Sequence, residues 1–152
     1  MNRDPDRSGQ AGALSVLTPL APGAEPDLRA YLEGLRAGPS PLARLAGTHF
    51  GRWVIVSDLV AEDEREPDHL AGPYLLFTAS FDGSPDSYLD ELCHELAAEA
   101  QEIWGRCAGA PQPSAGALAL SDLCRRHGVE GVASVIDMWL EARAADPAEG
   151  MN

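Results

Sequence analysis

The stretches THFGRWVIVSDLV (residues 48–60) and GPYLLFTASFDGS (residues 72–84) decide the fold of this chain. Both are rich in β-branched and aromatic residues, which are typical of strands. The charged segment between them, VAEDEREPDHL (60–70), suits an exposed connection. We therefore predict two strands, at 48–57 and 73–81, that pair antiparallel as a hairpin.

The segments before this hairpin indicate one strand and one helix. LSVLT (14–18) is a β-prone run that is stopped by prolines and a glycine. Pro26 then stands at a plausible first helical position. Apolar side chains recur after it with the i, i+3, i+4, i+7 spacing of an amphipathic helix, at Leu28, Tyr31, Leu32 and Leu35. This helix is expected to end near Gly38-Pro39.

The segments after the hairpin predict helices and a last strand. Ser84 as N-cap and Pro85 at the first helical position begin a long helix, whose apolar stripe continues to Ile103. A loop at 108–116 precedes a short helix that is expected to be capped by Ser121. VASVIDMW (132–139) fits either a helical face or a strand, and the topology of the preceding elements favours a strand at 132–138.

This order of elements predicts an α+β fold of the ferredoxin-like βαββαβ type. Residues 13–140 would form the domain, with a disordered tail at 1–12 and a second tail at 141–152. Helices would cover one face of the antiparallel sheet. An apolar open face usually packs against a second copy, so a homodimer in the form of a dimeric α+β barrel or sandwich is expected.

Composition excludes several classes of function. The 152-residue chain has a net charge of −13, which argues against nucleic acid and against anionic membranes, because both need a cationic surface. All 11 basic residues are arginine, so lysine chemistry is excluded. The N-terminus lacks the apolar run of a secretory signal, and a cytoplasmic location is the default. Three cysteines without CxxC spacing indicate buried thiols, and we predict no metal site.

Three short stretches resemble a known family: His49-Phe50-Gly51-Arg52-Trp53-Val54, the segment 75–84, and Arg125-Arg126-His127. They are similar to those of ferredoxin-like α+β domains that are distantly related to dye-decolourising peroxidases. The resemblance implies a haem as a possible cofactor and a role for Asp82, which matches the Asp of that family's GxxDG motif. Ala79 stands in place of the first glycine of that motif.

The candidate site residues lie on or near the hairpin. Asp82 and His49 are the catalytic candidates, with Asp82 also explained as a turn former before the helix. Arg52, Trp53, Phe77 and His127 are the ligand-binding candidates. In an unbulged strand side chains alternate, so His49 and Arg52 would lie on opposite faces and could not line one pocket.

Two functional hypotheses remain open. The first is a small-molecule-binding protein or cofactor-independent enzyme of the dimeric α+β barrel type, with an apolar cavity lined by Trp53 or Arg52. The second is a non-catalytic accessory module whose acidic surface docks a partner with a basic surface. A third, minor hypothesis is a degenerate haem peroxidase-like domain.

Overall fold

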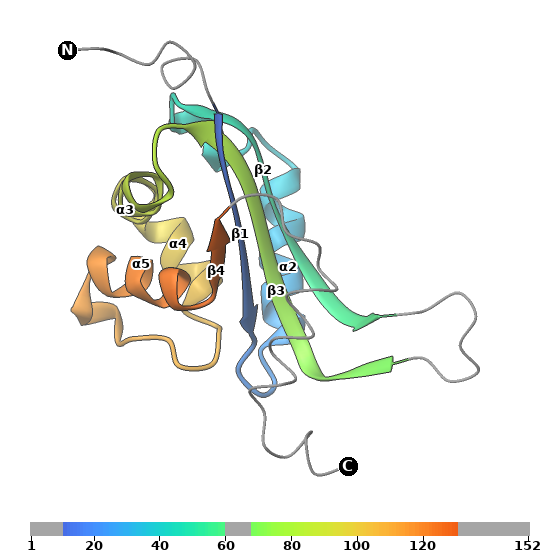
Figure 1. Ribbon diagram of the computed structural model, residues 1–152. Helices are drawn as coiled ribbons and strands as arrows, with labels where there is room; N and C mark the ends of the chain where they lie inside the picture. Colours follow the sequence, from blue (N-terminus) through green and yellow to red (C-terminus); the bar gives the residue numbers. More distant parts are fainter. Residues whose placement is uncertain (1–10, 60–67, 131–152) are drawn as a thin grey trace, which may run out of the picture.

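The computed structural model describes residues 11–59 and 68–130, and within them the strands form an antiparallel sheet (Figure 1). The strands are β1 (Ala11–Pro19), β2 (Thr48–Leu59), β3 (Asp68–Asp82) and β4 (Gly128–Glu130). They lie in the order β2-β3-β1-β4, so β2 forms one edge of the described sheet. Strand β2 pairs antiparallel with β3, and β1 pairs antiparallel with both β3 and β4. The predicted hairpin is therefore confirmed.

Helices connect the strands and gather against one face of the sheet. They are α2 (Glu25–Arg36), α3 (Pro85–Glu95), α4 (Ala97–Trp104) and α5 (Ala117–Arg126), with two short 3-10 helices, η1 (Pro41–Arg44) and η2 (Pro113–Ala115). Figure 1 shows α2 beside the β2 and β3 strands and α3, α4 and α5 grouped beside β1 and β4. The α+β class is thus confirmed. None of the helices in the described ranges is both long and apolar enough to span a bilayer.

One hydrophobic core joins all four α-helices to the sheet. Its sheet side contains Val16 of β1, Phe77 of β3 and Trp53 of β2, which lie side by side in the strand register. Its helix side contains Leu28 of α2 and Trp104 of α4, both fully buried. Side chains of β2 alternate between the two sheet faces, so Trp53 faces the helices and its neighbours Val54 and Arg52 face away.

The opposite face of the sheet carries a smaller apolar cluster. Leu17 of β1 and Leu76 of β3 are its buried members, and Val56 and Tyr74 pack against them. Phe50, on the same face of the edge strand β2, is 55% exposed. This face is mixed in character, because Arg52 and Thr78 also stand opposite each other on it.

Two helix predictions differ from the structure. The single helix expected from Ser84 to Ile103 is two helices, because Leu96 leaves the helical conformation at φ −110° and ψ 43°. The break lets Leu92, Leu96 and Ile103 all bury their side chains in one core. The helix expected to start at Ser121 starts at Ala117 instead, after Gly116, whose φ of +90° ends the preceding loop. Ser121 is therefore a buried interior residue and not a cap.

The ends of the predicted domain are covered only in part. Strand β1 extends the expected 14–18 to Ala11–Pro19. The fourth strand of the described sheet, β4 (Gly128–Glu130), pairs with Leu14–Val16 of β1. The strand expected at 132–138, the tail at 141–152 and most of the tail at 1–12 lie outside the described residues.

Candidate ligand-binding pocket

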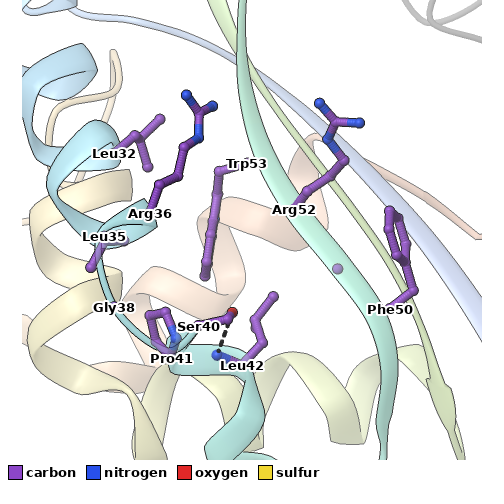
Figure 2. Close-up of a pocket in the computed structure, with 11 residues that line it drawn as sticks. Leu32, Leu35, Arg36, Gly38, Ser40, Pro41, Leu42, Phe50, Arg52 and Trp53 are labelled. Atoms are coloured by element: carbon purple, nitrogen blue, oxygen red, sulfur yellow. Dashed lines mark hydrogen bonds between the residues drawn. The ribbon is translucent and has the colours of Figure 1, made fainter.

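A pocket of about 400 Å³ lies where the end of α2 and η1 meet the edge strand β2 (Figure 2). This volume is within the range of small-molecule sites in proteins. The floor and walls are formed by Leu32, Leu35, Gly38, Pro41, Leu42, Phe50, Gly51 and Trp53, and the polar lining by Arg36, Ser40 and Arg52.

The turn after α2 shapes one wall of this pocket. Helix α2 ends at Arg36, and the N–H groups of Ala37 and Gly38 donate to the carbonyls of Gly34 and Leu35. Ser40 then caps η1, with its Oγ accepting from the N–H of Leu42 at 3.2 Å. The cap turns the chain so that Leu42 packs against β2 at Gly51. A Pro-rich connector thus becomes a wall because its short helix is fixed at the N-cap.

Trp53 forms the wall on the sheet side. Its indole is 7% exposed and packs on Phe77, with ring centroids 5.1 Å apart, and on Trp104, at 5.9 Å. The Nε1 atom of Trp53 is buried and has no hydrogen-bond partner among the described residues. Three large aromatic rings support one another, so this wall is rigid.

Two arginines stand on opposite sides of the pocket. Arg36 extends from the last turn of α2 and Arg52 from β2, as Figure 2 shows. Both are exposed, and neither takes part in an ion pair with any other described residue. Other arginines are paired with carboxylates, namely Arg29, Arg44, Arg106 and Arg125. The two pocket arginines are therefore available to a ligand.

Consecutive residues of β2 line one pocket because β2 is an edge strand. Trp53 points toward the helices, whereas Arg52 and Phe50 lie on the other side of the strand (Figure 2). In a central strand these side chains would be separated by the neighbouring strands on both sides. At the edge of the described sheet the pocket passes around the strand, so both faces contribute to it.

The two catalytic candidates meet each other outside this pocket. The Nε2 atom of His49 lies 2.7 Å from Oδ1 of Asp82, and both side chains are more than half exposed. A β-bulge between Thr48 and Phe50 displaces His49 from regular alternation, so the unbulged strand assumed above is not what forms there. Neither side chain lines the pocket.

The remaining ligand-binding candidates lie elsewhere in the fold. Phe77 is fully buried beneath Trp53, and it supports the pocket wall without lining the pocket. His127 follows α5, where its carbonyl accepts from the N–H of Leu17 at 3.1 Å. Burial lowers the pKa of its imidazole, and the nearby charge of Arg126 lowers it further. The backbone hydrogen bond to Leu17 makes His127 part of the junction between α5 and the sheet.

The described residues offer no metal centre and no reactive thiol. No group of three His, Cys, Asp or Glu side chains that could hold a metal ion occurs among residues 11–59 and 68–130. Cys93, Cys107 and Cys124 are free and buried, as predicted. Burial raises the pKa of Cys107 to about 12, so its thiolate, the nucleophilic form, is scarce at neutral pH.

Sequence reasoning predicted only Arg52 and Trp53 of this lining and missed the other residues, among them Arg36 and Ser40. Arg36 follows the apolar stripe of α2 by one residue, at the position where a cation usually complements the helix dipole. The helix-dipole explanation gives no sign that Arg36 also lines a pocket with Arg52, which is 16 positions away in the sequence. No family model, curated protein or solved structure matches this chain.

Proposed function

We propose that this protein binds a small molecule in the pocket between α2, η1 and β2. The observation that carries the proposal is the combination of an apolar, aromatic-walled recess with two arginines that have no partner among the described residues. Ligand sites in proteins are mostly apolar clefts with a few polar groups that orient the ligand.

Binding has more support than catalysis in this pocket. A general acid or base must lie within hydrogen-bond reach of the substrate. The lining includes no Asp, Glu, His, Cys or Tyr side chain within the described part of the chain. If the protein is a cofactor-independent enzyme, its acid or base would have to be His49 or Asp82, which lie outside the pocket lining.

A haem fits the pocket poorly. Protein ligands to haem iron are His, Cys, Met or Tyr, and the described lining contains none of them. Asp82, the residue that matches the peroxidase motif, is exposed and bonded to His49 away from this pocket. The resemblance to peroxidase-type domains is therefore proposed for the fold alone.

We also propose that the domain is ferredoxin-like and pairs through its second sheet face into a dimeric α+β barrel or sandwich. The alternation of β1, α2, β2, β3, three helices and β4, with strand order β2-β3-β1-β4, supports this assignment. The apolar cluster around Leu17 and Leu76 supports a contact through that face.

The alternative is the accessory module, which the net charge of −13 favours.

A thermal-shift screen of small molecules against the purified protein, followed by native mass spectrometry of the hits, tests binding. Gly38→Leu should narrow the pocket, since Gly38 lines it and a Cβ atom added there meets no described atom within 4 Å. Gly34→Leu is the matched control, because Gly34 also has free space but does not line the pocket.

The expected result is a ligand that stabilises the wild type and Gly34→Leu and loses its effect on Gly38→Leu. Equal binding to all three proteins would place the ligand elsewhere. A screen without any hit, combined with capture of a defined basic protein, would favour the accessory module.

A further inference from the structure

We infer that the ligand of this pocket is a singly charged anion, namely a small carboxylate with an apolar body. The inference rests on the proposed binding function and names its ligand class. The carboxylate would accept hydrogen bonds from the lining arginines, Arg36 and Arg52, and the body would lie against Trp53 and the leucines of α2. Three features of the lining lead to this assignment.

The first feature is an excess of hydrogen-bond donors. Arg36 and Arg52 are donors only, because a guanidinium has five N–H groups and no acceptor. Ser40 is the other polar side chain of the lining, and its Oγ already accepts from Leu42 N–H, which leaves the hydroxyl hydrogen to donate. No side-chain carboxylate or amide in the described lining offers an acceptor. A ligand rich in acceptors is the complement of such a site.

The second feature is that no described carboxylate neutralises the charges of Arg36 and Arg52. The chain has 24 acidic residues against 11 basic ones, so an arginine meets a carboxylate easily. Arg29, on the same helix as Arg36, does so with Glu25 at 2.6 Å. Arg36 and Arg52 are exposed and remain without an ion pair among the described residues. Planar carboxylates match the fork of a guanidinium with two parallel hydrogen bonds.

The third feature limits the ligand to about one negative charge. The pocket lies at the carboxyl end of α2, where the helix dipole is equivalent to roughly half a negative charge. Glu33 lines a small recess next to Arg36, and its carboxylate reduces the positive potential further. The positive charge of the two guanidinium groups is thus partly offset by the helix dipole and by Glu33. The remaining charge suits a monocarboxylate better than a doubly charged phosphate.

The apolar part of the pocket selects the body of the ligand. Leu32, Leu42 and Trp53 are almost completely buried, yet each presents a surface to the pocket. The volume of about 400 Å³ accommodates a body of the size of an aromatic ring with a short chain. Transfer of such a group from water to an apolar wall stabilises the complex by the hydrophobic effect.

The test compares 3-phenylpropionate, its neutral amide 3-phenylpropionamide, and phenyl phosphate, by isothermal titration calorimetry and saturation-transfer NMR on the full chain. The variants are Arg36→Gln and Arg52→Gln, and the control is Arg126→Gln. Arg126 is also exposed and without an ion pair among the described residues, and it lies on α5 outside the pocket. All three sites are exposed, so the variants should fold, which circular dichroism would check.

We expect the carboxylate to bind at least about tenfold more tightly than the amide, and each pocket variant to remove about that factor, because a charge-assisted hydrogen bond is lost. Arg126→Gln should bind like the wild type. Amide binding equal to carboxylate binding, or tighter binding of phenyl phosphate, would overturn the inference while leaving small-molecule binding intact. Absence of binding by all three probes, together with a thermal-shift screen that yields no hit on the wild type, would instead overturn the proposed function.

Discussion

The Cδ1 atom of Leu42 lies 2.6 Å from the position that a Cβ atom would take at Gly51. Real Cβ atoms do not approach a neighbour so closely, so the glycine is what lets η1 pack against the edge strand. The contact brings together one wall of the pocket and its floor, since both residues line it.

Gly51→Ala should therefore destabilise the protein by about 1–3 kcal/mol, the usual cost of overpacking a close contact. Chemical denaturation followed by circular dichroism would measure the free energy of unfolding. Gly34→Ala is the control, because Gly34 lies in α2 with no atom within 4 Å of an added Cβ. That variant should be more stable by about 0.5–1 kcal/mol, since alanine is the better helix former. An unchanged stability of Gly51→Ala would show that Leu42 moves aside without cost.

The sequence is most informative where one short segment determines the outcome. Pro26 and the apolar stripe of α2 predict that helix within one or two residues, and the Ser84-Pro85 cap predicts the start of α3. The hairpin and its alternating faces also follow from local pattern, because side chains in a strand alternate. These predictions need no knowledge of distant contacts.

The pocket could not be predicted in the same way. It depends on the packing of α2 and η1 against the edge of the sheet, which brings Arg36 and Arg52 to the lining of one pocket. Alternation alone separates Arg52 from Trp53, and only the edge position of β2 brings both to one cavity. The bulge at His49 likewise depends on pairing with β3 and leaves no clear sequence signal. The break at Leu96 contains neither Pro nor Gly and reflects burial in the core.

The N-cap of α3 gives a second stability prediction. The Oγ atom of Ser84 accepts from the N–H of Ser87 at 3.2 Å, which satisfies one of the unpaired donors in the first helical turn. Ser84→Ala should reduce the free energy of unfolding by about 1 kcal/mol. Ser87→Ala is the matched control, because Ser87 contributes only its backbone N–H to this bond. A similar loss in both variants would contradict the capping role.

A third prediction concerns the acid stability of the α3–α5 contact. Arg125 of α5 binds Asp86 at 2.8 Å and Asp90 at 2.6 Å, both on α3. The hydrogen bond from Arg125, aided by one from Ser121, lowers the pKa of Asp90 below its ordinary value of 3.8. The ionised carboxylate is thus stabilised in the folded state. Its contribution is complete above pH 3.8 and is lost as the pH falls through the lower folded pKa.

Asp90→Asn removes this contribution at every pH. The variant should be less stable than the wild type at pH 7, by about 1 kcal/mol or less because the pair is partly exposed and screened by solvent. The difference should shrink as the pH falls from about 4 to 2. Urea unfolding at pH 7 and at several acid pH values measures it. A difference that does not depend on pH would show that packing, and not the carboxylate charge, is what the variant loses.

The proposed dimer gives a fourth prediction. Val54 is half-buried on the second face of β2 and belongs neither to the pocket lining nor to the described apolar clusters. Val54→Glu would bring a carboxylate into the interface of a dimer that forms through this face, and burying an unpaired charge is costly. Light scattering coupled to size-exclusion chromatography should show a dimer for the wild type and for Val54→Thr, and a monomer for Val54→Glu. A wild type that is monomeric at all concentrations would refute this dimer.

The fifth prediction concerns His49 and Asp82, which form a bonded pair at 2.7 Å across the start of β2 and the end of β3. Their side chains are 54% and 59% exposed, and neither reaches the pocket between α2 and β2. If the pocket is the site of binding, Asp82→Asn and His49→Gln should leave the affinity for its ligand within about twofold of the wild type, since neither side chain lines the pocket. Titration calorimetry with the ligand found in the screen measures this affinity. A loss of tenfold or more in either variant would mean that the ligand extends to the bulge, and the His–Asp pair would then act on it directly as a possible acid–base couple.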